Sequence, residues 1–431
     1  MVAYHYPPCS GTSGVHRTLS FSRYLPRHGW RPIILTASPQ AYESKNDGQL
    51  GQIPDDAVVR RVFALDAKRQ LSWHGRYLRV MALPDRWITW FLGAVPAGLR
   101  LVRAHRPALI WSTYPIPTAH LIGLTLHRLT GLPWVADFRD PMTDGDYPPD
   151  AGQRRAYTWI ERQVVRYAAR LVFTTESTRA MYLRRYPTLS PDRAVVVPNG
   201  YEEDDFSALA AAPATPATAS GPFRLLHSGI IYPEERDPRP LLRALARLNR
   251  EGRLTPETLR MELRAPGHEA QYVSTIRELG LAGVVQVLPP IQHRQALQDC
   301  AGASALLLLQ GPAANAQIPA KTYEYLRLGR PILALTPHAS DTAAVLEECG
   351  GATRVDPLDE DAIYTALPSF VRAVQTGAHP LPDPTATARY ARHAQAGQLA
   401  ACFADLIRRS PAAEPRASAG SDPLRPSGHR S

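Results

Sequence analysis

Residues 304–310, Ser-Ala-Leu-Leu-Leu-Leu-Gln, lead into a loop at 311–319 and then into Ala320-Lys-Thr-Tyr-Glu-Tyr-Leu-Arg-Leu-Gly329. The apolar run is typical of a buried parallel strand, and Gly329-Arg-Pro331 ends the helix before a further strand at 332–335. A strand–loop–helix–strand unit directs the free N–H groups and the positive dipole end of its helix toward the space above the sheet. These residues therefore predict an α/β fold in which a helix N-terminus faces a ligand.

Lys321 and Glu324 lie one turn apart on that helix and share a face. A lysine can meet a diphosphate as a point charge, and a glutamate can accept hydrogen bonds from two ribose hydroxyls. The 49 basic side chains include three lysines, Lys45, Lys68 and Lys321, which leaves 46 arginines (49 minus 3). The lysine of the C-terminal half is thus a candidate for binding a nucleotide-linked donor; an exposed lysine paired with Glu324 is the alternative.

Length and charge narrow the class of protein. A chain of 431 residues favours two domains of roughly 200 residues each. The formal charge of +10 suits an anionic substrate or an anionic membrane surface. The arginines are scattered along the expected helices, and no nucleic-acid-binding motif organises them, so no nucleic-acid partner is expected.

The cysteines and the apolar segments indicate the compartment. Cys9, Cys300, Cys349 and Cys402 are far apart and share no metal-ligand spacing, which is typical of free thiols in a reducing compartment. Residues 1–7 resemble a strand that enters a loop more than a signal peptide, and no run of 18 or more apolar residues occurs. We therefore expect a cytoplasmic protein that does not span a membrane.

Strand and helix patterns alternate through residues 1–200, which favours a parallel, doubly wound sheet in a first, acceptor-side domain. Strands are expected at 2–6, 31–35, 58–63, 109–112, 134–138, 170–174 and 194–197, and helices at 16–28, 114–130 and 151–168.

A second alternating series occupies residues 223–385, after an Ala/Pro/Thr-rich linker at 201–222. A helix at 386–409 could pack back across the first domain, and a tail at 410–431 is expected to be disordered. The sequence therefore predicts two doubly wound domains that face each other across a cleft. The second series consists of strands at 223–229, 260–264, 284–288, 304–310 and 332–335, with helices at 238–250, 270–279, 293–301 and 320–329.

A glycine loop, Pro7-Pro-Cys-Ser-Gly-Thr-Ser-Gly14, follows the first expected strand and opens the first helix. Glycines there let backbone N–H groups approach an anion, and the helix dipole adds to that attraction. The spacing lacks the full dinucleotide-binding fingerprint and the Gly-Lys-Ser/Thr ending of a P-loop. Gly14 is a candidate donor-binding residue, and a plain tight turn is the alternative.

Taken together, four stretches resemble the family 4-like glycosyltransferases of the GT-B type, and they occur in the family's order. The resemblance implies two Rossmann-like domains facing across a cleft, a nucleotide-diphosphate sugar held mainly by the second domain, and transfer with retention of configuration to a polysaccharide, glycan or glycolipid precursor. The stretches are the glycine loop with the helix ending at His28-Gly-Trp30, Val135-Ala-Asp-Phe-Arg-Asp-Pro141, Val197-Pro-Asn-Gly200, and Ile318-Pro-Ala-Lys-Thr-Tyr-Glu-Tyr325 with Gly329-Arg-Pro331.

On this resemblance, Glu324 matches the second Glu of the family's Glu-x7-Glu motif, which holds the donor ribose, whereas Ala316 stands where the first Glu would be. Lys321 fits a branch of the family in which a diphosphate role is implied. Gly229 opens the loop where the family places an Arg and a Lys against the phosphates. In that loop Ile230 replaces the Arg, and Arg236 could stand for the Lys.

Arg139 falls where many family members carry an active-site His, and Asp137, Arg139 and Asp140 are expected at the end of a strand that faces the cleft. A retaining reaction in which the leaving diphosphate takes the acceptor proton needs no dedicated base. The enzyme must instead stabilise charge on the phosphates and orient two substrates. Arg139, Asp140 and Arg236 are therefore the candidate catalytic residues. An Arg–Asp pair that only shapes the loop is the alternative.

No cofactor or essential metal is expected, because the nucleotide sugar is a substrate. Asp144-Gly-Asp146 superficially resembles a metal-binding Asp-x-Asp, but chance is the better account in this Pro-rich loop. Residues 76–106 mix Trp, bulky apolar side chains and Arg, which suits peripheral contact with an anionic membrane; a core helix with a basic rim is the alternative.

Two other functions stay open. Ala316 and Ile230 suggest a catalytically inactive GT-B-like binding or assembly protein, because the family would place Glu and Arg there. A sugar-nucleotide epimerase could use the same double-Rossmann frame, but no set of acid/base carboxylates can be assigned to it.

Overall fold

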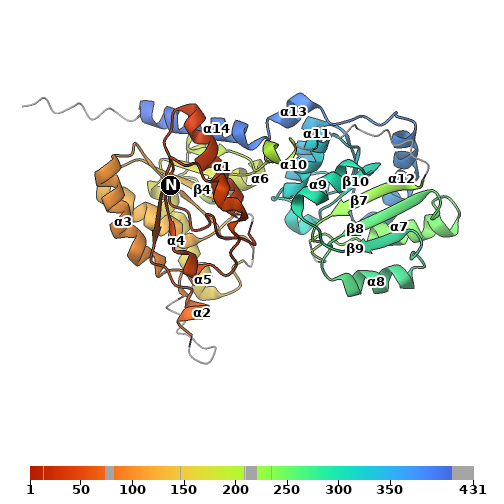
Figure 1. The fold of residues 1–431 in the computed structure, drawn as a ribbon, viewed down its shortest axis with the longest axis horizontal. Helices are drawn as coiled ribbons and strands as arrows, with labels where there is room; N and C mark the ends of the chain where they lie inside the picture. The colour runs from red at the N-terminus through yellow and green to blue at the C-terminus, as the bar shows by residue number, and fades with distance from the viewer. Residues whose placement is uncertain are drawn as a thin grey trace, which may run out of the picture.

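The computed structural model describes residues 1–12, 14–72, 82–145, 147–207, 209, 221–233 and 235–409. Two α/β lobes lie next to each other, and the chain passes from the second lobe back to the first near its C-terminal end (Figure 1). This confirms the predicted α/β class. Most of the linker expected at 201–222 and the tail expected at 410–431 lie outside the described residues.

The sheet of the N-terminal lobe is parallel throughout. Two blocks, β1-β2 and β3-β4-β5-β6, are joined by Val2, which forms parallel bridges to Leu35 and Ser112. The strand expected at 2–6 is therefore reduced to this bridge, because the chain then turns into a loop at Pro7 and Pro8, which have no N–H to donate. The strands are β1 (Ile33–Ala37), β2 (Val58–Val62), β3 (Ile110–Thr113), β4 (Trp134–Arg139), β5 (Arg170–Phe173) and β6 (Ala194–Val196).

Helices cover both faces of this sheet, as the alternating pattern predicts. The expected helix at 16–28 ends as an α-helix at Tyr24 and continues as a 3-10 turn, Leu25–His28, because Pro26 cannot donate an α-helical hydrogen bond. Gly131, at φ 72°, ends the next long predicted helix. The helices are α1 (Gly14–Tyr24), α2 (Ala67–Gln70), α3 (Trp90–His105), α4 (Pro117–Thr130), α5 (Ala151–Tyr167) and α6 (Glu176–Arg185).

The C-terminal lobe has a six-stranded parallel sheet in the order β12-β11-β10-β7-β8-β9. The chain runs outward from β7 on one side and from β10 on the other, so the crevice at the carboxyl ends of these two strands is the switch point where doubly wound sheets bind ligands. The strands are β7 (Phe223–Ser228), β8 (Leu259–Arg264), β9 (Val285–Leu288), β10 (Ala305–Leu309), β11 (Ile332–Leu335) and β12 (Ala352–Val355).

The stretch at 304–335 folds as predicted: β10 is fully buried, α10 follows it, and Gly329 caps the helix at φ 65°. Because α10 follows β10, its N-terminus lies at the switch point. The helices of this lobe are α7 (Arg239–Arg250), α8 (Glu269–Glu278), α9 (His293–Ala301), α10 (Ala320–Leu328), α11 (Asp341–Cys349), α12 (Glu360–Gln375) and α13 (Pro384–Ala388).

The last helix, α14 (Arg392–Arg409), crosses back to the first lobe and lies beside α1 (Figure 1), where Leu399 and Phe403 join the core around Trp111. The prediction of a C-terminal helix that packs back on the first domain is confirmed, but its expected start at residue 386 is wrong, because α13 and α14 are separated at 389–391. The physical reason is that the backbone at Tyr390 pairs with another segment: its carbonyl accepts a hydrogen bond of 3.2 Å from the Tyr201 N–H and does not take part in the hydrogen-bond pattern of a helix.

Candidate functional site

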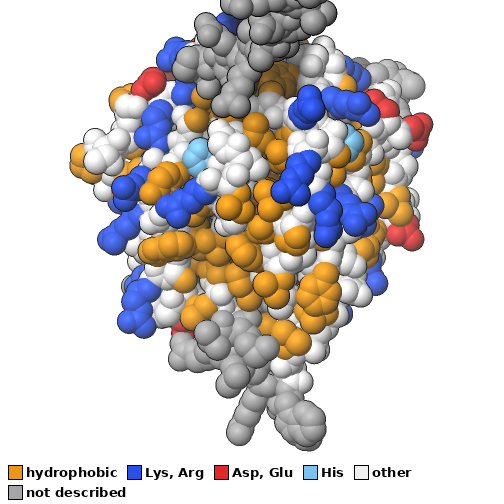
Figure 2. Space-filling model, turned by 90° about the vertical axis from the view of Figure 1, so that its left-hand side faces the viewer, with side chains coloured by type: hydrophobic (Ala, Val, Ile, Leu, Met, Phe, Trp, Pro, Cys, Tyr) orange, Lys and Arg blue, Asp and Glu red, His pale blue; other side chains and the backbone are white. Residues whose placement is uncertain are grey.

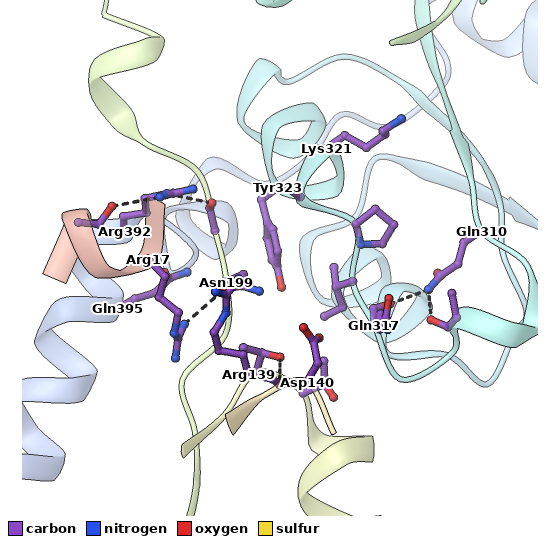
Figure 3. Close-up of a pocket in the computed structure, with 18 of the residues that line it drawn as sticks. Arg17, Arg139, Asp140, Asn199, Gln310, Gln317, Lys321, Tyr323, Arg392 and Gln395 are labelled. Carbon is purple, nitrogen blue, oxygen red and sulfur yellow. Dashed lines mark hydrogen bonds between the residues drawn. The ribbon is translucent and has the colours of Figure 1, made fainter. Parts of the chain in front are cut away.

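A cavity of about 400 Å³ lies between the lobes, and its lining includes several charged and amide side chains (Figure 3). Its size fits a nucleotide-sized ligand. From the N-terminal lobe it is lined by the ends of β4 and β5, part of α1 and the turn at 199–200; from the C-terminal lobe it is lined by the loop after β7 and the start of α10; α14 adds its first turn. Its polar lining includes Arg17, Arg139, Asp140, Asn199, Arg236, Gln310, Gln317, Lys321, Tyr323, Arg392 and Gln395.

Lys321 lies in the first turn of α10, and its ammonium is held by His227 from β7. Lys321 Nζ lies 2.9 Å from His227 Nε2, and His227 Nδ1 lies 2.9 Å from the Leu307 carbonyl oxygen. Burial and the neighbouring Lys321 hold the pKa of His227 well below its usual range, so the ring is neutral, and its Nε2 also lies 3.1 Å from the Gly229 carbonyl oxygen. Burial, followed by Arg236, lowers the pKa of Lys321 to about 7. Lys321 is thus a cation that gains and loses its proton near neutral pH.

Gly229 and Arg236 belong to the loop that leads from β7 toward Lys321. Gly229 has a φ of 105°, and a Cβ there would lie 3.2 Å from Lys321 Nζ, so the close approach of the lysine requires glycine. Arg236 lines the cavity, donates from Nη1 to the Ile230 carbonyl at 3.2 Å, and has a buried Nε without a partner. Two of the predicted phosphate-binding cations therefore meet at the N-terminus of α10, while Gly229 lies behind Lys321.

Glu324 does not line the cavity but lies at its margin. His293 Nε2, from the start of α9, is 3.7 Å from Glu324 Oε1 and 3.5 Å from Asp205 Oδ2. Burial raises the pKa of Glu324, and His293 and Arg392 oppose that rise. The carboxylate therefore faces a small cluster formed by both lobes, and its ribose-binding role stays a prediction.

Asp137, expected to face the cleft, is instead buried under it by Arg17 of α1. The guanidinium of Arg17 donates two hydrogen bonds of 2.9 Å to the two oxygens of Asp137, and Thr113 Oγ1 donates a third at 2.8 Å. Arg17 also donates to the carbonyls of Val197 and Pro198 at 3.0 Å. The pair ties α1, β4 and the turn after β6 together, so its role is structural.

Arg139 and Asp140 do line the cavity, at the end of β4 (Figure 3). Arg139 has a left-handed φ of 60°, and its carbonyl accepts a hydrogen bond of 2.7 Å from Thr174 Oγ1. Burial raises the pKa of Asp140, and the charge of Arg139 opposes the rise. Gly14 lies behind this pair: a Cβ on Gly14 would overlap the His5 ring and lie 3.2 Å from Arg139 Nη1. Glycine is thus needed for packing there.

Some lining residues carry no sequence signal that could have assigned them. Gln310 donates from Nε2 to the carbonyls of Ala314 and Gln317 at 2.7 and 2.6 Å, which shapes the loop that contains Ala316. Arg392 donates to Ser20 Oγ at 3.1 Å and to the Gly200 carbonyl at 3.3 Å. Arg392 could not be predicted because only the return of α14 brings it to the cavity.

Within the described ranges no three His, Cys, Asp or Glu side chains converge as a metal site. Asp144 forms an isolated bridge with Tyr147, and Asp146 lies outside the described residues.

Residues 13–200 match the family model described as a glycosyl transferase 4-like domain. A comparison with the curated proteins gives no match. Among solved structures, the chain is similar to Anabaena Alr3699/HepE in complex with UDP, at 15% identity and a TM-score of 0.61 over 94% of this chain and 100% of that one. A glycosyltransferase from Rickettsia africae ESF-5 aligns at 10% identity and a TM-score of 0.63, over 95% and 100% of the two chains.

WaaG, a glycosyltransferase involved in lipopolysaccharide biosynthesis, aligns at 14% identity and a TM-score of 0.59, over 93% and 98% of the two chains. Similarity at this level of identity establishes the fold, which is GT-B with both lobes included.

Proposed function

We infer that this glycosyltransferase, whose residues 13–200 form a glycosyl transferase 4-like domain within a GT-B fold, moves a sugar from a nucleotide-diphosphate sugar to a glycan or glycolipid acceptor with retention of configuration. The observation that carries the proposal is the pairing of Lys321 and Arg236 at the N-terminus of α10, on the switch point of the C-terminal sheet. Both cations line a cavity whose opposite wall belongs to the other lobe.

In this reaction the cations stabilise the negative charge of the departing diphosphate, and no protein side chain needs to remove a proton. When the bond to the sugar breaks, negative charge builds on the departing diphosphate, which Lys321, Arg236 and the free N–H groups of α10 can stabilise. The departing phosphate oxygen can then take the proton of the acceptor hydroxyl. Asp140 and Arg139 lie on the opposite wall, where they can orient the sugar or the acceptor.

Donor binding gives the first test. Thermal unfolding is measured with UDP, GDP, ADP and their common sugar conjugates, because a ligand that binds the folded state stabilises it by mass action. We expect one nucleotide series to raise the melting temperature, and Glu324→Gln to weaken that affinity by about tenfold through lost ribose hydrogen bonds. Glu347→Gln is the matched control, since that side chain is 72% exposed. If wild type and Glu324→Gln bind the nucleotide with equal affinity, Glu324 does not bind the donor ribose.

The same assay separates the rival functions. A donor that binds yet is neither transferred nor hydrolysed, across acceptors, would favour a binding or assembly protein, which Ala316 and Ile230 suggest. Conversion of the bound donor to its C2 epimer would favour the epimerase.

We also propose that the N-terminal lobe, which would bind the acceptor, contacts an anionic membrane from its cytoplasmic side. None of the helices in the described part of the chain is long and apolar enough to cross a bilayer. Figure 2 shows an apolar patch on the side of this lobe, with Lys and Arg side chains around it. On α3 the exposed residues include Leu92, Pro96, Arg100 and Arg103, and Leu92 is 70% exposed. An apolar surface with a basic rim fits a surface of anionic lipid.

Vesicle binding tests this contact. We expect the protein to bind vesicles of phosphatidylglycerol and phosphatidylcholine. Leu92→Glu should weaken binding by about tenfold, because an exposed leucine that enters the lipid surface is replaced by a charge that the anionic lipid repels. Leu381→Glu is the matched control: Leu381 is 60% exposed but lies in the other lobe. Equal binding of the two variants in a sedimentation assay would contradict the proposed contact.

A further inference from the structure

The cavity carries more positive charge than a donor diphosphate needs. Among the described residues, its charged lining consists of five cations, Arg17, Arg139, Arg236, Lys321 and Arg392, and one acid, Asp140. Arg17 is neutralised by Asp137 behind the wall. None of the other four cations forms an ion pair with any residue that the structure describes.

The diphosphate accounts for only one side of the cavity. Lys321 and Arg236 both belong to the C-terminal lobe and lie at the helix terminus that suits phosphate. A nucleoside-diphosphate sugar carries about two negative charges there, which these two cations match. Arg139 lies on the opposite wall, in the N-terminal lobe (Figure 3), and forms no ion pair with any described residue, although the carboxyl of Asp140 is near it.

The surroundings of Arg139 form a built site. The residue is only 6% exposed, its guanidinium Nε is buried without a hydrogen-bond partner, and no ion pair is formed with the nearby Asp140. The first turn of α1, an 11-residue helix, comes so close that only glycine fits at Gly14 beside Arg139 Nη1. His5, whose Nδ1 also lacks a partner, adds no negative charge because burial lowers its pKa to about 3.

A buried guanidinium cannot neutralise itself by losing its proton, and an unpaired buried charge is costly. We propose that Arg139, with the N-terminus of α1 beside it, binds a second anion: a carboxylate or phosphate on the transferred sugar or on the acceptor. The planar guanidinium suits such a group because it can donate two parallel hydrogen bonds. The proposal rests on the proposed function and specifies its substrates: at least one of them carries an acidic group besides the donor diphosphate.

The test compares acidic and neutral ligands by isothermal titration calorimetry. One arm uses UDP, UDP-glucose and UDP-glucuronic acid, with the matching GDP compounds if GDP is the nucleotide that binds. The other arm saturates the protein with that nucleoside diphosphate and adds glucose, glucuronic acid or glucose 6-phosphate. A donor-borne anion gives at least a tenfold preference for UDP-glucuronic acid in the first arm. An acceptor-borne anion gives binding of the acidic sugars, and not of glucose, in the second.

Arg139→Asn removes the charge while Asn tolerates the left-handed backbone, and Arg139→Lys retains the charge. We expect Arg139→Asn to abolish the acidic preference and to leave UDP affinity within threefold, with Arg139→Lys between it and wild type. The proposal is overturned if wild type prefers no acidic ligand in either arm, if Arg139→Asn retains the preference, or if it weakens UDP equally. Wild type alone decides if the variants fail to fold. Failure of every nucleotide to bind would instead overturn the proposed function.

Discussion

Replacing Lys321 with methionine is expected to lower kcat/KM for sugar transfer by about 10²–10³-fold, because the ammonium is a charge-stabilising donor in a water-poor site. Methionine retains most of the apolar stem, and the N-terminus of α10 is unchanged. Lys321 Nζ is fixed by His227 at 2.9 Å, so no other cation can take its place without moving. Initial rates with the donor found in the nucleotide panel measure the effect.

The exposed Lys68 offers a matched control, since Lys68→Met removes the same charge from the surface of the other lobe. We expect Lys68→Met to retain wild-type kinetics. A Lys321→Met enzyme within threefold of wild type would exclude the lysine from the reaction and leave Arg236 and the helix N-terminus as the phosphate site.

The pH dependence of donor affinity tests whether the positive charge of Lys321 is what binds the diphosphate. Burial and Arg236 lower the pKa of Lys321 from 10.5 to about 7, while Glu324 and Cys300 act in the opposite direction and His227 stays neutral. The free site is therefore charged below pH 7 and neutral above it, whereas a bound diphosphate favours the charged form. Affinity is full below pH 7 and falls as pH rises, by up to about tenfold per pH unit. Lys321→Arg, which keeps its proton, is expected to flatten this profile.

Removing the carboxylate of Asp137 is expected to destabilise the N-terminal lobe by about 3–5 kcal/mol, because it leaves the buried Arg17 unpaired. Asp137 is 0% exposed and receives three hydrogen bonds, from Arg17 Nε, Arg17 Nη2 and Thr113 Oγ1. Asp137→Ala removes all three, and Arg17 retains only the carbonyls and the amide of the turn at 197–199. Urea unfolding followed by tryptophan fluorescence measures the loss.

The probe is specific to this lobe, because all seven tryptophans precede residue 160. Asp192→Ala is the control: this aspartate is 59% exposed, and its surface ion pair with Arg409 contributes little, so we expect this variant to unfold at the same urea concentration as wild type. If Asp137→Ala unfolds at the same urea concentration as Asp192→Ala, the Arg17 pair does not stabilise the lobe.

Local sequence patterns were enough to predict most secondary structure. The apolar stretch at 305–309 and the strand at 332–335 are found where expected, since a buried run bounded by glycine and proline specifies a strand without help from distant residues. Lys321 and Glu324 could likewise be placed on one helical turn, because helical spacing is a local property.

The sequence alone therefore determined the α/β class, the two-lobe order and the N-terminus of α10 with its lysine. Only the tertiary structure decided which side chains meet. Asp137 is buried by Arg17 from 120 residues away, Arg392 reaches the cavity through the return of α14, and the buried Nε of Arg139 is left without a hydrogen-bond partner. The physical reason is that strands and helices follow from neighbours along the chain. Charge pairing and cavity walls depend on contacts between residues far apart in it.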